Sequence, residues 1–399
     1  MILTADRVVT GDGKTVLENG AIFVENGKIG DVGPVAALRG KYAGAEVREY
    51  QGASILPGLI DMHVHNGYYQ SRHDAAEYND FKIAFLAQDY CKRAFAKGVT
   101  TMRDVSSHKN LCASINYAVK QGFIEAPRLI STDSAISMTG GHGSGASGSN
   151  VEVDGPWAIR AAIRDNIKRG AQWIKIMASH RTNTPEFTQE ELDAAVHEAH
   201  RVGKKLAVHA GTQPSIQMCI DAGFDTIEHG THMTLAQARQ MKENGQVWCP
   251  TIAAYTRTYE YILESLNKTD IDAVGADFVE HHDYFRDAAM AYRDNFYTLY
   301  KTGIKIVCGT DVIFQDAPAT PMDWEMRYMA DYGMPVLEII QAATKNGAET
   351  LDIGHLTGDI SAGKAADILV VQGDVVADIG CVANVAEVFF GGKSVYRAS

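Results

Sequence analysis

The sequence predicts an α/β protein: a (β/α)8 TIM-like barrel with a small β-sandwich domain formed from both termini. Two patterns predict this fold. In the middle of the chain, short β-branched runs alternate with longer helical stretches, which is typical of parallel strands joined by helices. At both ends, period-2 alternation and glycine turns favour antiparallel strands. We therefore expect a composite β domain at residues 1–54 and 352–399, and the barrel at residues 55–351.

Eight runs predict the barrel strands, each followed by helical sequence. Their approximate ranges are 55–65, 99–105, 128–137, 173–178, 205–210, 226–229, 247–253 and 305–308. The segment from Thr188 to Glu191 resembles a capping box and predicts the start of a helix before the fifth strand. Turns at residues 11–13 and 26–27 separate the strands expected near the N-terminus, and residues 367–371 and 387–390 are expected to be strands near the C-terminus.

Composition limits the classes of partner. The 399-residue chain is 46% hydrophobic, and its 37 Lys and Arg against 49 Asp and Glu give a net charge of −12. No basic run could follow a phosphate backbone, and neither a signal peptide nor a membrane-spanning stretch is evident. We expect a cytoplasmic protein with a small-molecule substrate, with neither nucleic acid nor a membrane as partner, that forms a homo-oligomer of undetermined size. The six scattered cysteines favour reduced, mostly buried thiols.

The sequence His63-Val64-His65 closes the first expected barrel strand. Side chains at i and i+2 of a strand share a face, so the two imidazoles are placed to hold one metal ion. Further polar residues occur at other strand ends, where a barrel enzyme carries its chemistry. They are Lys175 on the fourth strand, His209 on the fifth, His229 on the sixth and Asp311 after the eighth.

Each of these residues alone has an ordinary structural explanation. Lys175 could pair with a carboxylate, His209 could be a core histidine, and Asp311 could cap a helix. Chance placement of all of them at matching strand ends is a poor explanation. Together they favour a metal centre at the mouth of the barrel.

At this point the chain resembles the amidohydrolase superfamily, from the segment Leu56 to His65 through to Gly363-Lys364-Ala365-Ala366-Asp367. The resemblance implies a binuclear metal centre of two divalent ions, usually zinc. His63, His65 and Asp311 would bind the more buried ion, His209 and His229 the other, and carboxylated Lys175 would bridge them. A carbamate presents two anionic oxygens, whereas a lysine ammonium has no lone pair to offer a cation.

This centre implies a hydrolytic mechanism. A hydroxide bridging two such ions forms at neutral pH and attacks the carbonyl carbon of an amide. Asp311 would be both a metal ligand and the general base that carries the proton to the leaving nitrogen. The expected reaction is therefore cleavage of a C–N bond.

Residues 138–143 and 174–179 resemble the subgroup of imidazolonepropionase-like proteins and Xaa-Pro dipeptidases. In that subgroup the loop histidine, here His142, faces the substrate, and it would donate a hydrogen bond to the oxyanion. The other candidate substrate contacts are Tyr68, His180, Arg181, Tyr255 and Arg257. Peptidases of the subgroup commonly carry a tyrosine two residues after the fifth-strand histidine, where this chain has Gly211.

We expect an enzyme that hydrolyses a small N-acyl amino acid or dipeptide-like substrate. Two alternatives remain open. The first is a cyclic amide hydrolase or deaminase of the imidazolonepropionase type, and Lys175 argues for amide cleavage at two metals over deamination at one. The second is a non-catalytic, hydantoinase-like structural protein, which would predict a broken ligand set.

Overall fold

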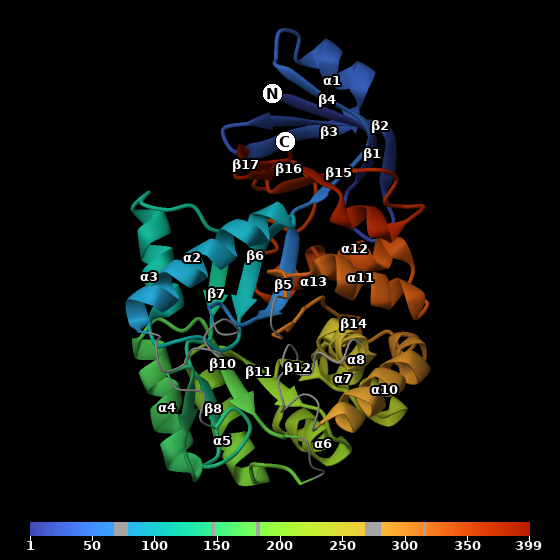
Figure 1. Ribbon diagram of the computed structural model, residues 1–399. Coiled ribbons are helices and arrows are strands. Elements are labelled where there is room, and N and C mark those ends of the chain that lie inside the picture. The colour runs from blue at the N-terminus through green and yellow to red at the C-terminus, as the bar shows by residue number, and fades with distance from the viewer. Residues whose placement is uncertain (68–78, 145–147, 181–183, 268–280, 314–316) are drawn as a thin grey trace. The chain divides into compact units, whose positions relative to one another are not determined.

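The computed structural model describes residues 1–67, 79–144, 148–180, 184–267, 281–313 and 317–399 (Figure 1). The chain divides into two compact units. The first comprises Met1–Asp61, Lys92–Thr101 and Ala319–Ser399, and the second comprises Met62–Cys91 and Met102–Pro318.

The first unit contains a seven-stranded sheet with the order β17-β16-β15-β4-β1-β2-β3. Strands from both ends of the chain share this sheet, as the blue and red arrows of Figure 1 show. β4 lies at its centre, parallel to β1 and antiparallel to β15. The strands are β1 Ile2–Val9, β2 Val16–Glu25, β3 Lys28–Pro34, β4 Val47–Pro57, β15 Ile368–Gln372, β16 Val385–Phe390 and β17 Lys393–Arg397. This topology is one sheet, so the β-sandwich stays a prediction.

Glycine turns and an apolar core hold this sheet together. Asn26 and Gly27 both have positive φ, 51° and 76°, which is the conformation that a two-residue hairpin turn requires between β2 and β3. Inward side chains from both chain ends form the core, among them Leu3, Ile55 and Ile368. The helices of this unit are α1 Val35–Lys41, α11 Met322–Asp331, α12 Val336–Ala342, α13 Lys345–Thr350 and the 3-10 helix η3 Ile379–Ala383.

The second unit contains a parallel sheet with the order β14-β13-β12-β11-β10-β8-β9. Its strands are β8 Ala135–Ser137, β9 Asn150–Glu152, β10 Trp173–Met177, β11 Lys205–Ala210, β12 Thr226–His229, β13 Val247–Cys249 and β14 Lys305–Ile306. A separate three-stranded sheet contains β5 Leu59–Val64, β6 Val99–Asp104 and β7 Arg128–Ser131. The α/β class with parallel strands is confirmed. Because the strands form two sheets, closure into a (β/α)8 barrel stays a prediction.

Helices alternate with these strands, and α4, α5 and α6 lie outside β10 and β11 in Figure 1. The helices are α2 Asp80–Ala96, α3 Leu111–Lys120, α4 Pro156–Lys168, α5 Gln189–Arg201, α6 Gln213–Ala222, α7 Leu235–Asn244, α8 Ile252–Asn267 and α10 His282–Tyr300. The predicted capping box is confirmed at α5. The Thr188 hydroxyl accepts from the Glu191 N–H at 3.3 Å, and the Glu191 carboxylate accepts from the Thr188 N–H at 2.8 Å.

Three of the eight predicted strands differ most from the strands of the structure. The run 55–65 is divided between β4 and β5 at Gly58, whose N–H donates to the Asp367 carbonyl at 2.9 Å. The run 128–137 is divided between β7 and β8, and Asp133 between them has a left-handed φ of 59°. The run 247–253 is a strand only to Cys249, since Pro250 has no N–H and Thr251 has a left-handed φ of 50°.

Two further observations concern the cysteines and the apolar character of the helices. The cysteines are all free thiols, and five of them are buried. Among the described helices, none combines the length and the apolar character that crossing a bilayer requires.

Candidate metal centre

The predicted ligands all lie in the second unit, either on parallel strands or in segments that follow their C-terminal ends. His63 is on β5, and His65 is one residue beyond its end. Lys175, His209 and His229 lie on β10, β11 and β12 respectively, and Asp311 follows β14.

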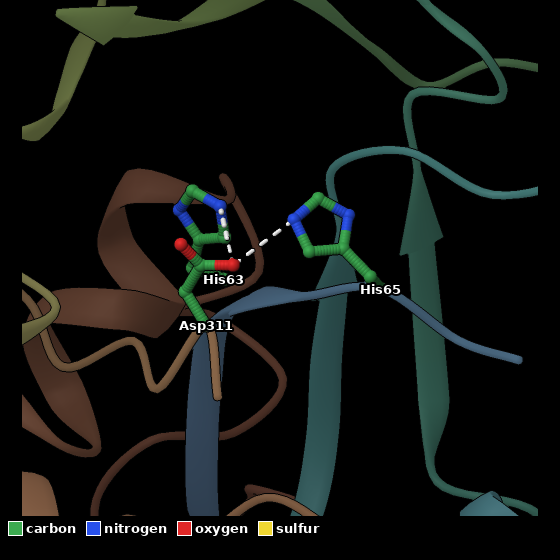
Figure 2. Close-up of side chains that lie close together, drawn as sticks. All are labelled: His63, His65 and Asp311. Carbon is green, nitrogen blue, oxygen red and sulfur yellow. Dashed lines mark ion pairs between the residues drawn. The ribbon is translucent and has the colours of Figure 1, made fainter. Parts of the chain in front are cut away.

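His63, His65 and Asp311 form one cluster of possible ligand atoms, all within 4.8 Å of one another. Figure 2 shows both imidazoles turned toward the carboxylate of Asp311. Oδ1 of Asp311 is 3.1 Å from Nε2 of His65 and 3.6 Å from Nε2 of His63. The Asp311 N–H also donates to the His63 carbonyl at 2.9 Å, which ties the two segments together.

The cluster continues through further imidazoles. The ring of His229 lies 5.0 Å from that of His63 and 4.3 Å from that of His209, measured between centroids. His229 Nδ1 is 3.8 Å from Oδ2 of Asp311, so this carboxylate faces histidines from two strands. The side chain of Lys175 is completely buried in the same unit.

The protonation states of these groups suit a divalent cation. Burial lowers the pKa of His63 to about 4 and those of His209 and His229 well below the ordinary value, so the imidazoles keep their lone pairs. Burial would raise the pKa of Asp311, but neighbouring His63 and His65 hold it below its usual range. Neutral imidazoles around an ionised carboxylate are a donor set that zinc and similar ions prefer.

Burial also lowers the pKa of Lys175, to about 8, against the opposing effect of Glu228 and Asp311. An amine with this pKa is neutral in a larger fraction of molecules near neutral pH than a surface lysine. Only the neutral amine has the lone pair that could react with carbon dioxide. The residues present therefore fit the metal centre that the sequence predicts and the carbamate that the family resemblance implies.

The backbone is strained at two of the predicted ligands and at one of their neighbours. His229, Thr251 and Asp311 have φ values of 65°, 50° and 45°, in the left-handed region that residues with side chains seldom adopt. A hydrogen bond from another strand stabilises the backbone conformation of His229, because the Trp248 Nε1–H donates to the His229 carbonyl at 2.7 Å. Thr251 Oγ1 lies 2.7 Å from Nδ1 of His229 and orients its ring.

A buried charge network that sequence analysis missed orients His63. Glu228 Oε2 is 2.8 Å from His63 Nδ1, and Glu228 Oε1 accepts from Arg103 Nη2 at 2.7 Å. Arg103 also donates to the Met62 carbonyl at 2.6 Å and to Thr226 Oγ1 at 2.9 Å. Arg103 and Glu228 have no solvent exposure. The sequence signal for them was a charged residue within each of two runs predicted to be strands, β6 and β12.

One proposed substrate contact, His142, adjoins an imidazole of the cluster, and a second, His180, adjoins His142. The His142 ring lies 4.2 Å from that of His209 and 4.7 Å from that of His180. Glu186, a second residue missed by sequence analysis, accepts from the His142 backbone N–H at 2.9 and 3.0 Å. A Cβ on Gly141 would lie 2.7 Å from this carboxylate, so the close approach requires glycine.

Tyr255 is the other candidate that adjoins an imidazole of the cluster. The Tyr255 ring contacts that of His229 at 5.4 Å between centroids. Arg257, also on α8, pairs with Glu264 at 2.8 Å and with Glu260 at 3.4 Å. Tyr68 and Arg181 lie outside the described residues, so their roles remain predictions.

Comparison with known proteins agrees with the family resemblance of the sequence. The sequence pattern of the amidohydrolase family matches residues 54–395. A crystal structure of a Xaa-Pro dipeptidase with bound methionine in its active site is 32% identical, with a TM-score of 0.86, covering 100% of this chain and 99% of that one. Ochratoxinase from Aspergillus niger is 28% identical over 98% of this chain and 86% of its own length. Imidazolonepropionase from Geobacillus kaustophilus is 24% identical over 89% and 84% respectively.

Glu228→Gln tests the orienting network. Loss of the carboxylate charge leaves Arg103 without its anion and weakens the acceptor for the Nδ1–H of His63, so zinc affinity should fall by about 10- to 100-fold. Affinity is measured by competition with a chromogenic chelator, and circular dichroism verifies the fold. The exposed Glu243→Gln on α7 is the matched control and should leave affinity unchanged. Wild-type affinity in a folded Glu228→Gln protein would contradict this role.

Proposed function

The chain belongs to the amidohydrolase family, and on that premise we propose a binuclear-metal hydrolase that cleaves the C–N bond of a small N-acyl amino acid or dipeptide-like substrate. The observation that carries the proposal is the cluster of His63, His65 and Asp311, with the imidazoles of His209 and His229 beside it. The 32% identity to a dipeptidase that binds methionine in its active site supports an amino-acid substrate.

We assign His63, His65 and Asp311 to one divalent ion and His209 and His229 to a second, with carboxylated Lys175 shared by both. Zinc is the metal we favour, because three or more imidazoles and a carboxylate match its preferences. When bound, the two ions polarise the substrate carbonyl and lower the pKa of a bound water.

Side chains of the protein transfer the proton and stabilise the negative charge that develops on the substrate carbonyl oxygen. The carboxylate of Asp311 is held ionised by His63 and His65, so it can accept a proton from the attacking water and pass it to the leaving nitrogen. We assign the His142 imidazole to donate to the carbonyl oxygen as it becomes an oxyanion. Glu186 supports this role because it fixes the His142 backbone through two contacts.

A second candidate is hydrolysis of a cyclic amide, which the 24% identity to an imidazolonepropionase favours. It would use the same residues, since opening a ring amide also requires water attack and proton delivery to nitrogen. A deaminase is the third possibility, with one metal ion in place of two.

A substrate panel with metal analysis distinguishes these reactions. We expect the zinc-loaded protein to contain about two ions per chain and to hydrolyse N-acetyl amino acids or dipeptides in preference to cyclic amides. His63→Ala should lose an ion and most activity while remaining folded. Preferential turnover of cyclic amides would shift the assignment to the second candidate, and one ion with ammonia release would shift it to deamination. A fully active His63→Ala protein with two ions would contradict the metal assignment.

Lys175→Ala tests the carbamate. The variant should keep its fold and lose most activity, because the shared anionic ligand is gone, and added acetate or another short acid should restore part of it. Lys175→Arg should show no such recovery, because a guanidinium fills the space and stays charged. Extra density beyond Nζ of Lys175 in a metal-loaded crystal would support the modification. A bare ammonium paired with a carboxylate there would contradict it.

His142→Ala tests the oxyanion contact. The donor acts most strongly in the transition state, so kcat should fall by about 10²-fold or more while metal content stays unchanged. Glu186→Gln should cause a smaller loss, since it loosens the backbone of His142 without removing the ring. A raised KM with an unchanged kcat would mean that His142 binds the ground state and the transition state equally.

A further inference from the structure

A second buried carboxylate, that of Asp104, lies at the C-terminal end of strand β6. Its Oδ2 accepts from the backbone N–H of Asn66 at 2.7 Å, and its Oδ1 accepts from the backbone N–H of Ser106 at 3.3 Å. The hydroxyl of Ser107 is a third donor to this carboxylate. Burial raises the pKa of Asp104 to about 6, and the three donors oppose the rise, so the group is mostly ionised at neutral pH.

The orientation of the His65 ring depends on the backbone carbonyl of Ser106. Nδ1 of His65 lies 3.1 Å from this carbonyl oxygen, and Nε2 lies 3.1 Å from Oδ1 of Asp311, toward which the ring points in Figure 2. A carbonyl oxygen can only accept, so the contact requires the hydrogen on Nδ1, and in the neutral ring the lone pair is then on Nε2. The Ser106 carbonyl therefore selects the nitrogen that faces Asp311.

Asp104 joins the two segments that this contact requires. One of its oxygens binds the backbone of the residue after His65, and the other binds the backbone of Ser106, whose carbonyl holds the His65 ring. The Ser106 hydroxyl also donates to the Ser149 carbonyl at 2.7 Å, which anchors this segment from a second side. The bonds to Asp104 are charge-assisted, and such bonds are stronger than those between neutral groups.

The support of His65 differs from that of His63. Glu228 contacts the His63 ring directly, whereas Asp104 acts on the His65 ring through two backbone segments. We propose that Asp104 is a positioning residue of the candidate metal centre: it holds the His65 segment and the Ser106 carbonyl together, so that Nε2 of His65 is the nitrogen available to a divalent ion. This inference rests on the proposed function, because that function assigns His65 to such an ion.

Asp104→Asn tests this role with little change in volume. The amide keeps one acceptor oxygen but turns an NH2 group toward a backbone N–H, so one of the two backbone hydrogen bonds is lost. Zinc affinity should fall by about 10-fold or more, because the ligand is no longer held in place. Affinity is measured by competition with a chromogenic chelator after circular dichroism has verified the fold. Wild-type affinity in the folded variant would overturn the proposal.

Glu198→Gln is the matched control. Glu198 is also a buried carboxylate of the second unit, and it accepts from Nε of Arg164 at 2.8 Å, between helices α5 and α4. The variant should lower the unfolding temperature, because it weakens this ion pair, and it should leave zinc affinity unchanged. An equal loss of zinc affinity in both variants would mean that affinity follows general stability, which would overturn the proposal.

Proton exchange at the imidazoles of the zinc-loaded protein tests the ring of His65 itself. The Nδ1–H signals of His63 and His65 in nuclear magnetic resonance spectra are assigned by their loss in single His→Gln variants. Asp104→Asn should speed exchange of the His65 Nδ1–H with water by about 10-fold or more, because its acceptor carbonyl is released. The His63 Nδ1–H, which faces Glu228, is the internal reference and should not change. Unchanged exchange at His65, or an equal change at both rings, would overturn the proposal.

Ser107→Ala replaces Asp104→Asn if that variant does not fold. It removes one donor to the carboxylate without placing a new donor against the backbone. Zinc affinity should fall by about 2- to 5-fold, and exchange at His65 should rise by a similar factor. Wild-type values of both quantities would overturn the proposal.

These measurements use no substrate, so they separate failure of this inference from failure of the proposed function. If the metal-loaded protein hydrolyses no N-acyl amino acid while Asp104→Asn still weakens zinc binding, the proposed function is wrong and the role of Asp104 is supported. If the wild type hydrolyses such substrates while Asp104→Asn keeps wild-type zinc affinity and His65 exchange, the proposed function is supported and the role of Asp104 is overturned.

Discussion

The carboxylate of Glu228 lies between the guanidinium of Arg103 and the imidazole of His63, and the candidate metal centre depends on this contact. A buried carboxylate without a cation would neutralise itself by taking up a proton. The charge of Arg103 holds the pKa of Glu228 well below its ordinary value against the effect of burial. The carboxylate therefore remains an acceptor for Nδ1–H of His63, and the Nε2 lone pair of that ring faces Asp311.

Sequence could predict the candidate ligands, but it could not predict the pair of residues that orients one of them. Histidines, a lysine and an aspartate at the ends of apolar strands are conspicuous by residue type, so sequence analysis found His63, His65 and Lys175. The pairing of Arg103 with Glu228 joins residues 125 positions apart. No local pattern encodes that distance. The fold shows the same division, because the hairpin turn at residues 26–27 was predictable from local residue preferences, whereas strand order was not.

Two of the missed strand limits, at Asp133 and Thr251, share one physical cause. Sequence patterns indicate which residues prefer an extended backbone, but they do not indicate which residue adopts a left-handed φ. At Asp133 and Thr251 a left-handed residue ends a run of residues that otherwise favour a strand. Near the candidate metal centre these left-handed residues orient side chains. Thr251 contacts the ring of His229, and His229 also has a left-handed φ. Backbone strain of this kind persists at positions where it orients a functional side chain.

The sheet shared by both chain ends constrains how the protein is made. β1 and β4 are made early, but β15, which pairs with the other edge of β4, is made much later. Arg48 likewise pairs with Glu387, which is 339 residues further along the chain. At typical ribosome speeds that interval is on the order of tens of seconds. During it the nascent chain presents an apolar strand with unpaired backbone groups, which is a template for association with other chains. Chaperone supply and translation rate should therefore govern the yield of this protein in a heterologous host.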